Sequence, residues 1–263
     1  MAHTWDPDRY LAFGDERGRP FLDLVARIGA EDPRAVVDLG AGPGTLTALL
    51  HRRWPDAHVL AVDASPEMIE RARAVDGVEA RLGDLRDWAP EAPVDVVVTN
   101  AALQWVPGHR ELLPRLVGHL APGGWFAMQV PGNHEAPSHA LLRGLAADPR
   151  YSRWTAGVEH PVSDDPSDYL RALQDTGCEV DAWETTYLHV LDREGEQDNP
   201  VLEWVRGTGL RPVLEILTDE AERDALLADY GARLKAAYPR TGAGVILPFR
   251  RVFTVVHVPG TGV

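Results

Sequence analysis

The sequence predicts an α/β protein with a doubly wound, mostly parallel sheet of seven strands and a helical cap made from insertions. Between residues 34 and 131, short runs of β-branched residues alternate with segments of helical periodicity. This pattern is typical of strand–helix–strand units around a parallel sheet. Two long segments rich in β-branched and aromatic residues, 178–191 and 245–258, predict late strands in the same sheet, and the segments around them predict the cap.

Five strands and three helices are expected in the first half of the chain. Ser65 stands directly before Pro66, and this pair favours a hydroxyl N-cap followed by proline at the first helical position. The "APGG" of residues 121–124 ends the third helix. The expected strands are residues 35–40, 58–63, 78–85, one within 94–105, and 125–130, and the expected helices are 45–54, 65–75 and 109–120.

The alternation of predicted strands and helices is less regular in the second half of the chain. Residues 132–175 are rich in Pro, His and Asp and contain helical pieces, such as residues 138–147. Further helices are expected at 201–207 and 218–238. No internal repeat or low-complexity tract interrupts the chain.

Composition and charge narrow the class of protein. The 263 residues are 44% hydrophobic, which is enough for a sizeable core. The formal net charge of −14 argues against non-specific nucleic-acid binding and against anionic lipid surfaces. The single cysteine, Cys178, excludes an internal disulfide, and we interpret it as a buried structural thiol. Because no targeting segment and no stretch of about 18 apolar residues is present, we expect a soluble, cytoplasmic protein.

A glycine-rich segment, "VVDLGAGPGTLTALL" at residues 36–50, joins the first strand to the first helix. Gly40, Gly42 and Gly44 occupy alternate positions, two residues after Asp38. The dinucleotide fingerprint is G-x-G-x-x-G, whereas the spacing here is G-x-G-x-G. Such a loop either lets a ligand approach the backbone or only permits tight packing, and the loop by itself leaves both interpretations open.

Two further acidic residues follow the neighbouring strands. Asp63 ends the second strand, where a carboxylate can accept hydrogen bonds from both hydroxyls of a ribose. Asp84 and the Leu85 backbone lie at the end of the third strand, where an adenine edge would lie. One acid at a strand end can be an ordinary cap, but acids after three successive parallel strands favour a nucleoside-binding site.

This set of residues resembles the class I S-adenosylmethionine-dependent methyltransferases, a Rossmann-like family. The resemblance implies S-adenosylmethionine as cofactor, S-adenosylhomocysteine as product and no metal. It also implies that the segment "DLGAGPG" contacts the aminocarboxypropyl group, Asp63 the ribose and Asp84 the adenine amine. The segment "TNAALQW" matches the region beside the reactive methyl group, so Asn100 joins the cofactor-binding set and Gln104 and Trp105 are expected to position the reactants.

A closer resemblance, to the trans-aconitate 2-methyltransferase family, covers nearly the whole chain. Its segments are "WDPDRYLAF", "NAALQWVPGH", "LAPGGWFAMQVPGN", "GCEVDAWETTYLHVL", "EWVRGTGLRP" and "FRRVFTVV". It implies an O-methyltransferase that forms the monomethyl ester of trans-aconitate. The chain departs from the family in residues 132–168, whose role the resemblance leaves open.

A carboxylate acceptor is consistent with the residues themselves. Carboxylates have an ordinary pKa near 4, so they are ionised at neutral pH and need no general base. An enzyme for such an acceptor therefore has to align the two reactants and exclude water from the carboxylate. His109 and His134 could serve as bases for another acceptor, but we interpret both as surface or hydrogen-bonded side chains.

A small di- or tricarboxylate requires cations, and arginine can bind a carboxylate with two hydrogen bonds. Arginines lie near aromatic residues in three places, at residues 10–19, 204–211 and 250–253. Each arginine on its own is more simply a solvated surface charge. The predicted substrate-binding residues are Tyr10, Arg19, Trp204, Arg211 and Arg250.

The predicted organisation follows from these assignments. Residues 1–33 form an N-terminal helical segment on the substrate side, and residues 34–131 form the cofactor-binding core. Residues 132–175 and 195–240 form the helical cap, and residues 176–194 and 245–259 form the last strands of the core sheet. We expect a monomer or a weak homo-oligomer.

Three rival functions stay open. The first is a methyltransferase for another small or carrier-bound carboxylic acid, such as a malonyl thioester, although a charge of −14 is unhelpful for docking an acidic carrier. The second is an NAD-dependent oxidoreductase, against which the G-x-G-x-G spacing counts. The third is a non-catalytic regulator that binds the cofactor, against which the intact "NAALQW" segment argues.

Overall fold

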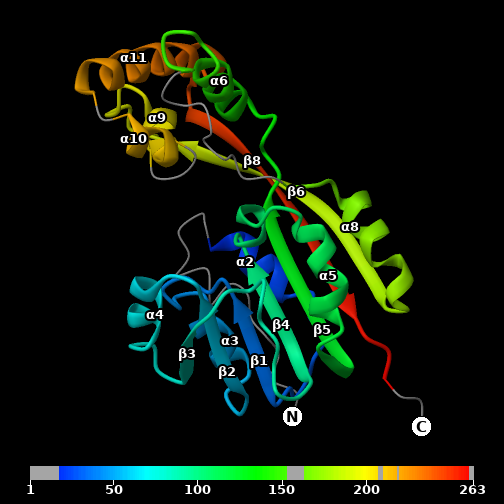
Figure 1. Ribbon diagram of the computed structural model, residues 1–263. Coiled ribbons are helices and arrows are strands. Elements are labelled where there is room, and N and C mark those ends of the chain that lie inside the picture. The colour runs from blue at the N-terminus through cyan, green and yellow to red at the C-terminus, as the bar shows by residue number, and fades with distance from the viewer. Residues whose placement is uncertain (1–17, 153–162, 207–209, 218, 261–263) are drawn as a thin grey trace. The chain divides into compact units, whose positions relative to one another are not determined.

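The computed structural model describes residues 18–152, 163–206, 210–217 and 219–260, and these residues divide into two compact units (Figure 1). Unit 1 is formed by the described residues up to Pro131 together with Ser163–Thr185 and those after Arg250. Unit 2 is formed by the described residues between Gly132 and Val162 and between Thr186 and Arg250. Strands β6 and β8 contribute residues to both units.

The sheet confirms the predicted architecture. Its order is β3-β2-β1-β4-β5-β8-β6, and the pairs among β1 to β5 are parallel, whereas β8 runs antiparallel to β5. A two-residue strand, β7, pairs with β8 and adds an eighth strand that the sequence did not predict. The bounds are β1 Ala35–Leu39, β2 His58–Asp63, β3 Val78–Leu82, β4 Val94–Asn100, β5 Leu120–Pro131, β6 Glu179–Leu191, β7 Arg240–Thr241 and β8 Gly244–His257.

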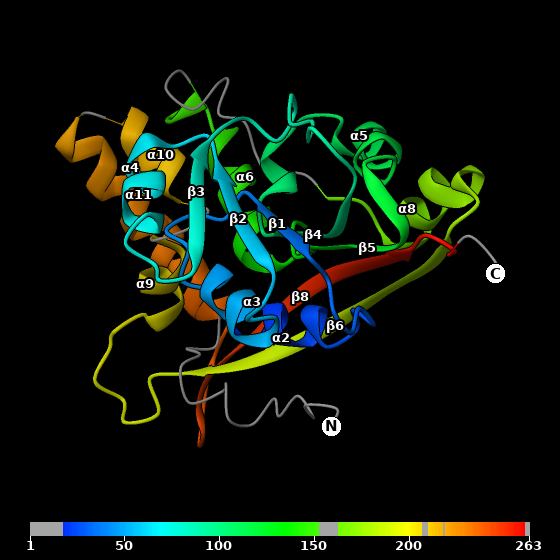
Figure 2. The same ribbon diagram turned by 90° about the horizontal axis from the view of Figure 1, so that it is seen from below.

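Helices cover both faces of the sheet in unit 1, as Figures 1 and 2 show for α2 and α3 on one face and α5 and α8 on the other. The side chain of Ser65 accepts a hydrogen bond from the Met68 N–H, which confirms the predicted N-cap of α4. The bounds are α2 Arg19–Val25, α3 Thr47–Arg53, α4 Pro66–Ala72, η1 Leu103–Trp105, α5 His109–Val117, α8 Pro166–Leu173 and η2 Gln174–Thr176.

Helix α8 belongs to unit 1, whereas the sequence analysis grouped its residues with the cap. The physical reason is the burial of Tyr169 and Leu173, which are fully enclosed in the core of unit 1 beside α5. That core also contains Phe126, Met128 and the apolar side chains of β1 and β4 on the same face. Cys178 packs against this core but is half-buried rather than buried as expected, and its Sγ donates to the Thr176 carbonyl at 3.7 Å.

Unit 2 has a core of its own. Long helix α11 supplies Leu226, Tyr230 and Leu234, which pack with α6 and α9 and with the unit 2 part of β8. Asp219 caps α11 by accepting a hydrogen bond from the Glu222 N–H. The helices of unit 2 are α6 Pro137–Ala146, α9 Pro200–Arg206, α10 Arg211–Ile216 and α11 Glu220–Ala237.

Candidate active site

The loop between β1 and α3 contains three glycines with positive φ, at +75° for Gly40, +57° for Gly42 and +77° for Gly44. Packing accounts for two of them. A Cβ atom on Gly40 would lie 2.3 Å from the Ala102 Cβ, and one on Gly44 would lie 3.1 Å from the Ala72 Cβ. A Cβ atom on Gly42 would meet nothing within 4 Å. Tight packing therefore explains why glycine occupies positions 40 and 44, whereas the space beside the Gly42 Cα is open and a ligand can occupy it.

Asp38 is the penultimate residue of β1, close to the start of this loop, and it is almost fully buried. Its Oδ2 accepts a hydrogen bond of 2.6 Å from the Thr47 hydroxyl. Burial raises the pKa of Asp38 to about 6, the Thr47 hydrogen bond lowers it and the charge of Asp63 raises it. Thr47 was missed by the sequence analysis, although a hydroxyl at the start of a helix that follows a strand-end carboxylate is a usable signal. Together the two side chains fix both ends of the glycine loop.

Asp63 joins the loop after β1 to the loop after β2. Its Oδ2 accepts a hydrogen bond of 2.9 Å from the Gly42 N–H, and its Oδ1 accepts one of 2.8 Å from the Ser65 N–H. Each carboxylate oxygen has a second lone pair, so these bonds leave capacity for further donors. The carboxylate is half-buried at the carboxyl end of the sheet, which is where the sequence analysis placed it.

Asp84 and Leu85 follow β3. Hydrogen bonds from the Arg86 side chain, and then from the Arg86 N–H, hold the pKa of Asp84 below its usual range. Leu85 approaches the glycine loop, because its Cδ2 would lie 4.0 Å from a Cβ atom on Gly40. The loops after β1, β3 and β4 therefore meet around Gly40, where Ala102 is the other neighbour.

The turn after β4 is strained and tightly held. Ala101 has φ +53°, an unfavourable conformation for a residue with a Cβ atom. Its N–H donates to the Gln129 carbonyl at 2.8 Å, and its carbonyl accepts from the Gln104 Nε2 at 2.6 Å. Strain of this kind persists only where the surroundings determine it, and it is concentrated at functional sites.

The predicted positioning residues differ in exposure. Gln104 is buried and supports the Ala101 carbonyl, whereas the Trp105 side chain is 54% exposed. Asn100 is half-buried, and its Oδ1 accepts a hydrogen bond of 3.1 Å from the Gln129 Nε2. Gln129 was not among the predicted site residues.

The two histidines considered as bases occupy different units. His109 is buried in unit 1, with Nδ1 3.2 Å from the Val106 carbonyl and Nε2 2.7 Å from the Tyr169 hydroxyl. Burial lowers the pKa of His109, and both ring nitrogens already have partners, so the ring is a structural element. His134 lies in unit 2, where its carbonyl accepts a hydrogen bond from Arg143 and its ring contacts His139 edge-on.

The predicted substrate residues are divided between the units, whereas the cofactor-binding set is gathered in unit 1. Arg19 is exposed at the start of α2 in unit 1. Trp204 stacks on His189 at 5.1 Å between ring centroids, and Arg250 donates to the Gly132 carbonyl at 3.1 Å, all within unit 2. Arg211 is the first residue of α10, and Tyr10 lies outside the described residues.

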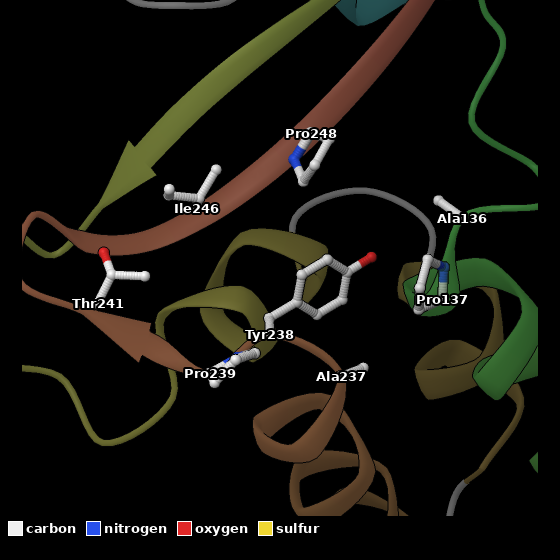
Figure 3. A pocket seen from close by; sticks show the side chains of 8 residues that line it. All are labelled: Ala136, Pro137, Ala237, Tyr238, Pro239, Thr241, Ile246 and Pro248. Atoms are coloured by element: carbon white, nitrogen blue, oxygen red, sulfur yellow. The ribbon is translucent and has the colours of Figure 1, made fainter.

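Unit 2 contains an apolar pocket of about 360 Å³, shown in Figure 3. None of its lining residues belongs to the predicted site. A carboxylate placed against such an apolar wall would lose its hydration without gaining a cation, so the pocket is unsuited to the proposed acceptor. The lining residues are Ala136, Pro137, Ala237, Tyr238, Pro239, Thr241, Ile246 and Pro248.

Within the described ranges, no group of three or more His, Cys, Asp or Glu side chains is arranged to hold a metal ion. Among the helices that these ranges contain, none has both the length and the apolar character that crossing a membrane requires.

The chain is similar to known methyltransferases over most of its length. A family model described as "Methyltransferase domain" matches residues 13–182. A protein of Rhodococcus jostii (strain RHA1) named trans-aconitate 2-methyltransferase is 53% identical over 258 residues, covering 97% of this chain and 99% of that protein. One of the same name from Mycobacterium tuberculosis (strain ATCC 25177 / H37Ra) is 50% identical over 260 residues, covering 97% of each.

A solved structure shares the fold at much lower identity. The YcgJ protein of Bacillus subtilis matches with a TM-score of 0.58 at 12% identity, covering 94% of this chain and 100% of that one.

Proposed function

Because the chain belongs to the methyltransferase-domain family, we propose that it is the S-adenosylmethionine-dependent enzyme that methylates a carboxylate of trans-aconitate. The observation that carries the cofactor assignment is the open space above Gly42, beside a loop whose other glycines are explained by packing. The near full-length similarity to proteins named trans-aconitate 2-methyltransferase carries the acceptor assignment.

The residues of unit 1 fit this cofactor. The backbone around Gly42 would hold the methionine part, the remaining lone pairs of Asp63 would accept from the ribose hydroxyls, and Asp84 with the Leu85 backbone would meet the adenine. S-adenosylmethionine supplies an electrophilic methyl group when bound. Asn100, Gln104 and Trp105 would lie beside the reacting groups and position them.

The acceptor requires no general base. A carboxylate attacks as the ionised form that predominates at neutral pH, and the products are the monomethyl ester and S-adenosylhomocysteine. His109 supports this assignment because both of its ring nitrogens have partners inside the core. The protein therefore aligns the reactants and excludes water.

Binding of an anion by a chain with net charge −14 requires local cations. We propose that the helices of unit 2 act as the cap and that Trp204, Arg211 and Arg250 contribute to acceptor binding, together with Tyr10 and Arg19. A carrier-bound malonyl thioester is the alternative acceptor, and the acidic surface disfavours an acidic carrier. We also propose that the enzyme works in the cytoplasm as a monomer or weak homo-oligomer.

The test is a panel of acceptors incubated with enzyme and S-adenosylmethionine and analysed by mass spectrometry. The panel contains trans-aconitate, other di- and tricarboxylates, and a malonyl thioester on its carrier. We expect trans-aconitate to give the highest kcat/KM and a product with one added methyl group. Preference for the carrier thioester would overturn the acceptor assignment while leaving the cofactor assignment intact.

A further inference from the structure

We propose that Gln129 is a positioning residue, which holds the Asn100 amide so that its Nδ2 group presents a hydrogen-bond donor to a carboxylate of a bound ligand. The proposal rests on the proposed function, since both the methionine part of the cofactor and the acceptor carry a carboxylate. It concerns the side chain of a residue in the middle of the sheet that sequence analysis did not select.

The contact is set by strand register. Asn100 is paired with Gln129 across β4 and β5, so the two side chains lie on the same face of the sheet. Gln129 is 1% exposed, and its Nε2 lies 3.1 Å from the Asn100 Oδ1. The Gln129 carbonyl also accepts from the Ala101 N–H at 2.8 Å. Gln129 therefore fixes the last residue of β4 and the residue after it, through hydrogen bonds from its side chain and to its backbone carbonyl.

The direction of the amide pair follows from the cost of burying unpaired groups. As arranged, the Gln129 Oε1 is buried without a hydrogen-bond partner among the described residues. Reversing both amides would instead leave the Gln129 NH₂ group buried without an acceptor. Orphaned buried N–H groups are rarer in proteins than under-satisfied carbonyl oxygens, so the observed arrangement is favoured.

The Nδ2 group is then the end of Asn100 that can donate to a ligand. Its Oδ1 is engaged by Gln129, and within the described part of the chain its Nδ2 has no hydrogen-bond partner. Asn100 is half-buried and directly precedes the strained Ala101, next to the loop that packs against Gly40. An NH₂ group at that place matches a carboxylate oxygen, whereas an amide oxygen would repel it.

The experiment reverses the polarity of the pair with Gln129→Glu. Binding is measured at pH 8.5, because burial raises the pKa of a carboxyl at this position and a protonated carboxyl would donate to the Asn100 Oδ1 as Gln129 does. The ionised carboxylate would accept from the Asn100 Nδ2 and turn the Oδ1 toward the ligand. Binding of S-adenosylhomocysteine is compared by calorimetry with binding of 5′-methylthioadenosine, which has the same nucleoside and no carboxylate. The KM for trans-aconitate is measured beside them.

Two results would support the proposal and identify the carboxylate. Weakening of S-adenosylhomocysteine by about tenfold or more, with methylthioadenosine unchanged within about twofold, assigns the cofactor carboxylate. A tenfold rise in KM for trans-aconitate with unchanged binding of both nucleosides assigns the acceptor. Equal weakening of both nucleosides, or no change in any of the three, would overturn the proposal.

Gln129→Met provides a second variant if the buried glutamate prevents folding, since it keeps the volume and removes the donor. It should shift the same selectivity in the same direction by about threefold, and unchanged selectivity would again overturn the proposal. Thr99→Val is the matched control, because Thr99 is a buried polar residue of β4 whose hydroxyl has no partner among the described residues. The nucleoside comparison does not require trans-aconitate to be the acceptor, so it stays informative if the proposed function fails.

Discussion

Replacing Asp38 with asparagine should remove a pH dependence from the stability of the ligand-free protein. Burial raises the pKa of Asp38 from 3.8 to about 6. Because the folded pKa lies above the unfolded pKa, the folded protein keeps a proton that the unfolded chain has already lost between these values. The free energy of unfolding therefore falls as the pH rises through this window, and the full loss is present above about pH 6.

The magnitude follows from the size of the shift. A rise of about two pKa units corresponds to about 3 kcal/mol, of which about 2 kcal/mol falls between pH 4.5 and pH 7.5. The asparagine side chain keeps an oxygen that can accept from the Thr47 hydroxyl, and it cannot ionise. The loss of stability between these two pH values should thus be about 2 kcal/mol smaller in Asp38→Asn than in the wild-type protein.

Urea unfolding of both proteins at pH 4.5 and 7.5 measures this difference, and contributions from groups that do not interact with Asp38 cancel in the comparison. Thr47→Val is an informative companion, since loss of the hydrogen bond that lowers the Asp38 pKa should move the wild-type transition to higher pH. Profiles for wild type and Asp38→Asn that run parallel within about 0.5 kcal/mol would refute the reasoning.

Three further results are expected. Gly42→Ala should cost only about 1 kcal/mol of stability, the usual penalty for its φ, but should weaken the binding of S-adenosylhomocysteine measured by calorimetry. Gly40→Ala should instead unfold at a clearly lower temperature, because its Cβ would clash with Ala102; equal effects of the two variants on stability would count against this distinction. Single-turnover rates should be independent of pH between about pH 6.5 and 8.5, because an ionised carboxylate needs no base, and the pH profile of His109→Gln should have the same slope as that of the wild-type enzyme. A steep rise of the rate through neutral pH would show an acceptor that must lose a proton. Alanine at both Arg211 and Arg250 should weaken transition-state stabilisation for trans-aconitate, obtained from the ratio of kcat/KM values, by about 2–5 kcal/mol per lost charge pair, and cofactor affinity should stay unchanged. A rate within twofold of wild type would redirect attention to the arginines near residue 19.

The geometry of the glycine loop and of the strand ends beside it could be predicted from the sequence because its constraints are local, whereas the cofactor contacts of these residues stay a prediction. The φ values of Gly40, Gly42 and Gly44 and the cap at Ser65 are properties of single turns, and each is visible as a residue type at one position. Asp63 ends a parallel strand, and the carboxyl ends of parallel strands meet at one edge. Local patterns and one topological rule were sufficient.

Contacts across long sequence separations could not be predicted in this way. The His109–Tyr169 hydrogen bond joins residues 60 apart and places α8 in unit 1, and no periodicity marks either residue for the other. The Gln129–Asn100 contact depends on the register of two strands, which periodicity leaves undetermined. Arginines are frequent on surfaces, so their spacing cannot tell a ligand contact such as the one proposed for Arg250 from a solvated charge.

The central claim is that a carboxylate oxygen of trans-aconitate receives the methyl group. Incubation with cofactor labelled with ¹³C in its methyl group, followed by NMR of the isolated product, tests it most directly. We predict one labelled methyl per molecule, bonded to oxygen and coupled through it to a single carboxyl carbon. A label bonded to carbon, or no transfer to trans-aconitate by enzyme that binds S-adenosylhomocysteine, would contradict the claim.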